Sequence, residues 1–115
     1  MGKYLLLLIL LLPVPCYAID TKDIILEASW QALHYIDYRQ TIEIAEHPDQ
    51  FKERNPILGS HPSKGTVNTY FAITSALHLI TWYVIPDKYR DIFQLVTIAG
   101  TTVCLVNNYR VGVRF

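Results

Sequence analysis

The chain has 115 residues, of which 51% are hydrophobic and 17% are charged, and its ten basic residues balance its ten acidic ones. This zero balance argues against a nucleic-acid-binding protein, which needs a basic face. The charged fraction is below the ~25% usual in soluble domains, and it favours a membrane protein.

The first eighteen residues have the three parts of a secretory signal peptide. Lys3 supplies a positive start, the run from Tyr4 to Leu12 is apolar, and Cys16 and Ala18 are small residues at the −3 and −1 positions. The apolar run is far shorter than the ~20 residues that a membrane-spanning helix needs. We therefore predict cleavage after Ala18.

Residues 19–115 then form a single all-α membrane domain, and the segment 24–45 is its first expected helix. Glu27, His34 and Thr41 share one face of this helix, with Asp37 at the edge of that face. The opposite face is apolar. The segment can therefore cross the membrane as the first of three spans, or lie on the periplasmic surface.

Two further segments predict an antiparallel membrane hairpin. Residues 67–85 carry no formal charge, and Trp82 and Tyr83 lie near one end, as in the aromatic belt of a spanning helix. Residues 91–110 have no charged residue in their interior, and a short polar turn joins the two segments. Cys104 is the one cysteine left after cleavage, so it cannot form an internal disulfide.

Basic residues distinguish the two topologies, because cytoplasmic loops carry an excess of Lys and Arg. Three spans with the mature N-terminus outside place five basic residues in the cytoplasm: Lys52, Arg54, Lys64, Arg110 and Arg114. The same arrangement places three in the periplasm: Lys22, Lys88 and Arg90. Two spans reverse this bias. We therefore expect a three-helix transmembrane bundle in the bacterial inner membrane, with helices at about 24–45, 67–85 and 91–110.

A charge inside the membrane requires a polar interior. A mid-helix Asp costs roughly 2.5 to 3.5 kcal/mol on insertion scales, so Asp37 is expected to face other helices. The two later helices each carry a polar stripe at helical spacing, and His78 lies in the first of them. We predict that these stripes turn inward and that the polar core contains His34, Asp37, Thr41 and His78.

The loop between the first two helices contains "ERNPILGSHPSKG", residues 53–65, and its candidate functional residues are Glu53, Asn55 and His61. Together with "DYRQT" at 37–41, the start of this loop resembles small polytopic bacterial membrane proteins that pair an Asp-x-x-x-Thr helix with a Glu-x-Asn-Pro loop. The resemblance implies a compact bundle of three or four membrane helices. It implies no activity.

These features favour a non-enzymatic role in helix–helix interaction within the lipid bilayer, as a homo-oligomer or in a larger membrane complex, without a cofactor. One alternative is a membrane-embedded enzyme or metal site using His34, Asp37 and His78. Neither His-Glu-x-x-His nor Gly-x-Ser-x-Gly occurs, however. The other alternative is a small transporter or channel component.

Overall fold

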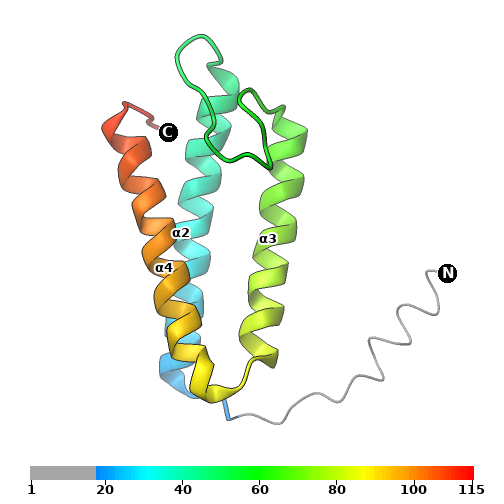
Figure 1. Ribbon diagram of the computed structural model, residues 1–115, viewed down its shortest axis with the longest axis vertical. Helices are drawn as coiled ribbons and strands as arrows, with labels where there is room; N and C mark the ends of the chain where they lie inside the picture. Colours follow the sequence, from blue (N-terminus) through cyan, green and yellow to red (C-terminus); the bar gives the residue numbers. More distant parts are fainter. Residues whose placement is uncertain (1–17) are drawn as a thin grey trace, which may run out of the picture.

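The structure, a computed structural model, describes residues 18–115, so nearly all of the predicted signal peptide lies outside the described residues. These residues form three α-helices and contain no strand. The helices are α2 (Thr21–Glu46), α3 (Lys64–Val84) and α4 (Asp87–Arg110), and they run up, down and up (Figure 1). The all-helical fold and the three helices predicted from the sequence are confirmed.

Each helix begins three or four residues before its predicted start, and side-chain caps stabilise the first turns of α2 and α3. Asp20 accepts a hydrogen bond from the backbone N–H of Asp23, whose side chain accepts one from the N–H of Asp20, which forms a capping box. Ser63 caps α3 by accepting from the N–H of Thr66 at 3.1 Å. Pro86 separates α3 from α4, since proline cannot donate within a continuing helix.

The helix α2 holds the bundle together. It lies between α3 and α4 and packs along both, whereas α3 and α4 make few contacts with each other although a short turn joins them (Figure 1). The loop 47–63 and the C-terminus lie at one end of the bundle, which we call the loop end. The start of α2 and the α3–α4 turn lie at the opposite end, the turn end.

The bundle buries many polar side chains beside its apolar ones and exposes many large apolar side chains. Its buried polar side chains are Asp23, Glu27, His34, Gln40, Thr41, His78, Arg90 and Gln94. Large apolar side chains are exposed on all three helices, among them Ile24, Ile25, Ile73, Leu77, Ile80, Ile92, Leu95, Val96 and Val103. A soluble bundle shows the reverse arrangement, with an apolar stripe facing the core.

Among the described residues, α4 is the one helix long and apolar enough to cross a membrane by length and composition. The sequence suggested that α3 is equally suited to this role. Helix α3 does not meet this criterion, and its sequence contains His78, Asn68 and several hydroxyl side chains. The transmembrane bundle predicted from the sequence is therefore supported only in part by helix composition.

An apolar cluster closes the loop end. Leu58 of the loop packs against Val67 and Phe71 of α3, with Tyr38 and Ile42 of α2 at the edge of the cluster. The loop therefore folds back onto the bundle. This return brings loop residues close to the middle of α2.

Arg90 closes the turn end. The sequence predicts Arg90 among the periplasmic charges, but its side chain is buried inside the bundle and only 1% exposed. Its guanidinium donates to the carboxylates of Asp23 and Asp87 at 3.2 and 2.6 Å. It also donates to the main-chain carbonyls of Trp82 and Ile85, which end α3. One side chain thus joins the starts of α2 and α4 to the end of α3.

Replacing Arg90 with Met is expected to lower the free energy of unfolding by roughly 3 to 5 kcal/mol, because it leaves buried Asp23 without its charged partner. The measurement is a denaturant titration in detergent micelles, followed by circular dichroism. Lys88→Met is the matched control, since Lys88 is exposed in the same turn of α4. Equal stability of the two variants would contradict the structural role of Arg90.

Candidate functional site

Glu27 is the centre of a buried hydrogen-bond network that joins the three helices. Its carboxylate accepts from Nδ1 of His78 on α3 at 2.9 Å and from Nε2 of Gln94 on α4 at 2.9 Å. Gln31, one turn further along α2, donates to the same carboxylate at 2.9 Å. Glu27 is 5% exposed and Gln94 is fully buried, so these partners replace the hydration that the carboxylate loses.

Above Glu27, three aromatic rings form a stack. The Trp30 ring lies between the imidazoles of His78 and His34, with centroid distances of 3.5 and 4.4 Å. The Trp30 indole N–H donates to the hydroxyl of Thr101, and Nε2 of His34 donates to the hydroxyl of Thr74 at 2.8 Å. The stack therefore fixes both histidines by ring contact and by hydrogen bonds.

Glu27, His78 and Thr97 lie in the order carboxylate, imidazole and hydroxyl, with 2.9 Å between Nε2 of His78 and Oγ1 of Thr97. Nucleophilic hydrolases use this order of groups. However, the Thr97 hydroxyl also donates to the main-chain oxygen of Phe93 at 2.9 Å, and it has only one hydrogen. The N–H groups beside Thr97 are bonded within α4, so they cannot stabilise an oxyanion. This geometry favours a structural network.

A second polar region, the loop-end cavity, has a volume of about 310 Å³. Asp37 and Thr41 of α2 line it together with Glu53 and Asn55 of the loop. The remaining lining residues include Arg54, Leu58, Phe71, Cys104, Asn107 and Asn108. The two short motifs that carry the sequence resemblance therefore meet at one place in the fold.

Glu53 and Asn55 also give the loop its shape. One carboxylate oxygen of Glu53 accepts from the backbone N–H groups of Arg54 and Asn55, both at 2.9 Å. The Asn55 side chain accepts from the N–H of Ile57 and donates to the hydroxyl of Tyr70. The hydrogen bonds of Glu53 therefore stabilise the turn of the loop, and the bond from Asn55 to Tyr70 holds the loop against α3.

The structure places the predicted site residues in three different surroundings. His34, Thr41 and His78 are buried in the bundle, whereas Asp37 is half-buried at the loop-end cavity. His61 is exposed and lines neither this cavity nor the histidine stack. The predicted polar core is thus split into a histidine network at mid-height and a carboxylate region near the loop.

The metal alternative receives no support at the predicted residues. Within residues 18–115, the one group of three or more potential ligands with ligand atoms within 4.8 Å of one another is Glu43, Glu46 and His47. His34, Asp37 and His78 do not form such a group because the Trp30 ring separates the two imidazoles.

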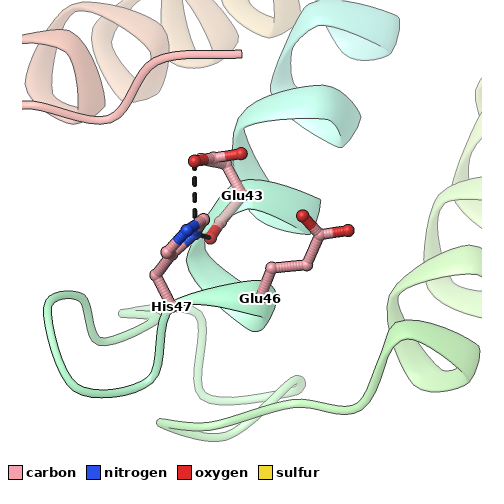
Figure 2. Close-up of side chains that lie close together, drawn as sticks. All are labelled: Glu43, Glu46 and His47. Atoms are coloured by element: carbon pink, nitrogen blue, oxygen red, sulfur yellow. Dashed lines mark hydrogen bonds and ion pairs between the residues drawn. The ribbon is translucent and has the colours of Figure 1, made fainter.

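Figure 2 shows the Glu43, Glu46 and His47 side chains at the end of α2. Glu43 pairs with His47 at 3.2 Å, and Glu46 pairs with Lys64 at 2.6 Å. The hydrogen bond from Lys64 lowers the pKa of Glu46 and in turn raises the pKa of Lys64. The carboxylate of Glu46 already has a cationic partner, so the cluster is most simply a link between the ends of α2 and α3.

No family model, curated protein or solved structure matches this chain.

Sequence reasoning missed several residues that build the network. Glu27 and Gln94 were placed on polar faces but were not identified as core residues, although their helical spacing was the available signal. Trp30 carried no such signal, because an aromatic residue beside a polar stripe looks like ordinary packing. Arg90 was interpreted as a surface charge, since its partners come from three different helix ends.

Replacing Glu27 with Ala should destabilise the bundle by roughly 3 to 5 kcal/mol, because buried His78 and Gln94 then lose a charged acceptor. A denaturant titration in micelles measures the effect. Glu43→Ala on the same helix is the control, and its half-buried carboxylate should matter little. A small effect of Glu27→Ala would show that the helices are held mainly by other contacts.

Proposed function

We propose that the protein is an integral membrane protein with three spans and a non-enzymatic role in helix–helix assembly within the bilayer. The observation that carries this proposal is the distribution of polarity. Charged and amide side chains are buried and each has at least one hydrogen bond, although Oε1 of Gln94 has no partner among the described residues. Large apolar side chains face outward on every helix. In the hydrocarbon core of a membrane, polar side chains are stable only where they face other helices. The arrangement of polar and apolar side chains therefore suits a membrane environment.

The ends of the bundle support the same interpretation. Basic residues predicted to be cytoplasmic lie at the loop end, and exposed Tyr83 and Tyr89 lie near the turn end. At the loop end, the Arg114 guanidinium lies 3.7 Å from the ring centroid of Tyr109. Arginine and tyrosine side chains are typical anchors at the membrane–water interface. In the proposed insertion, these side chains lie at the two membrane–water interfaces, and the apolar surface of the helices extends between them.

A cleft of about 470 Å³ lies between α3 and α4, and it is the surface at which we propose that a second helix packs. Its walls carry Thr74, Thr81, Thr97, Gly100, Thr101 and Cys104. Small and hydroxyl side chains let membrane helices approach closely and hydrogen-bond to one another. In the proposed assembly, α4 of one copy packs against α4 of a second copy at this cleft, because a two-fold contact uses the same surface on both chains.

The topology is tested with single cysteines in a Cys104→Ala background and a membrane-impermeant thiol reagent. Gln50→Cys and Ser60→Cys, in the loop, should be protected in intact cells and labelled once the membrane is opened. Lys88→Cys, at the turn end, is the control and should be labelled in intact cells. Labelling at Gln50→Cys and Ser60→Cys in intact cells would contradict the three-span topology.

The self-assembly is tested by oxidative crosslinking of Cys104 in native membranes. The chain should form a disulfide-linked dimer, because the exposed Cys104 lies on the proposed contact surface. Gly100→Leu should suppress the dimer by at least about tenfold, since a large side chain keeps the helices apart. No atom lies within 4 Å of a Cβ built at Gly100, so the variant itself should fold.

The matched control is Ala99→Leu, the neighbouring exposed position of α4, which lies outside the cleft lining. It should leave the crosslinked fraction unchanged. A chain that stays monomeric with Gly100 intact, or that loses the dimer equally in both variants, would refute assembly through this cleft.

A further inference from the structure

Asp37 has a different environment from the other carboxylates inside the bundle. Asp23 is paired with Arg90, and Glu27 is bonded to His78, Gln31 and Gln94. Within residues 18–115, Asp37 has no ion-pair partner. It lines the loop-end cavity, so this carboxylate faces a space that a ligand can occupy.

The loop-end cavity is lined by several hydrogen-bond acceptors with spare capacity, together with the N–H donors of Arg54 and Asn107. Glu53 uses one carboxylate oxygen to bind the loop backbone, which leaves its second oxygen available. The Asn108 amide donates through Nδ2 to Gln40 at 3.0 Å, so its oxygen is free to accept. The Thr41 hydroxyl donates to the main-chain oxygen of Asp37, and its lone pairs are free as well. Such a lining is complementary to a positively charged N–H donor.

The size and the walls of this cavity favour an organic cation over a bare metal ion. A volume of about 310 Å³ corresponds to about ten water molecules. Among the residues that the structure describes, Asp37 and Glu53 belong to no set of three potential metal ligands. The Phe71 ring forms part of the wall, and an aromatic wall suits an organic cation.

We propose that the loop-end cavity binds a primary ammonium group, held by Asp37 and Glu53 against Phe71. Arg54 lines the same cavity and is suited to a phosphate attached to that ammonium. The cavity lies near the end of α4, the level at which lipid headgroups would be found if the proposed membrane insertion holds. The ammonium can therefore come from an ethanolamine lipid headgroup or from a free small amine.

The test uses the full chain in nanodiscs, with thermal stability and native mass spectrometry as readouts. In phosphatidylglycerol discs, free ethanolamine should raise the melting temperature in a saturable manner, whereas choline, which has no N–H donor, should not. Discs that also contain phosphatidylethanolamine should show the same rise without added amine if the lipid is the source, and that lipid should be retained in the mass spectrum.

Asp37→Asn and Glu53→Gln should each weaken ethanolamine binding by at least about tenfold, because each removes a charged acceptor while keeping the side-chain shape. Asp49→Asn, an exposed carboxylate of the same loop, is the control and should bind as the unchanged chain does.

The outcomes separate this proposal from the proposed assembly. Binding of ethanolamine by the chain in detergent, where no lipid is present, supports the cavity whatever the number of spans. Absence of any rise with both ethanolamine and phosphatidylethanolamine would refute it, as would equal binding by Asp37→Asn and the unchanged chain. Neither result bears on the effect of Gly100→Leu on crosslinking, because Gly100 lines the cleft and is not among the residues that line the loop-end cavity.

Discussion

The hydrogen bonds of the Glu27 carboxylate are the contacts on which the positions of all three helices depend. Because α3 and α4 make few contacts with each other, each is located mainly by its contact with α2. Glu27 binds His78 of the one and Gln94 of the other, and both partners are buried. A buried carboxylate accepts a narrow range of geometries, since any lost partner leaves an unsatisfied charge. The network therefore fixes the rotation of each of the three helices about its own axis. Apolar contacts alone would specify this rotation only weakly.

The two ends of the bundle are built differently, and this difference decides where the candidate sites lie. At the turn end, Arg90 occupies the interior and satisfies the carboxylates and carbonyls around it. At the loop end, the returning loop brings Glu53 toward Asp37 without a buried cation between them. The turn end is therefore closed by its own side chains, whereas the loop end keeps a polar cavity. The proposed ammonium site follows from this asymmetry.

The proposed assembly follows from the limited contact between α3 and α4. Hydroxyl groups of both helices line the cleft between them and bond to carbonyls of their own helices, as Thr81 and Thr97 do. Such hydroxyls keep lone pairs that a second helix can use. A bundle of four or more helices would cover this surface with its own chain. In the proposed assembly, a second copy covers this surface.

The sequence by itself determined the helices and the polar faces. Charge-free segments, the prolines, the helical spacing of His34 and Thr41 and the polar stripe that contains His78 predicted three helices with inward-facing polar residues. These signals are local and repeat with the helical period. Only the tertiary structure decided which polar groups meet. It buried Arg90, inserted Trp30 between two histidines, left Asp37 at a cavity and kept His61 exposed. These outcomes depend on how the helices rotate and where the loop returns, and such long-range contacts leave no periodic pattern in the sequence.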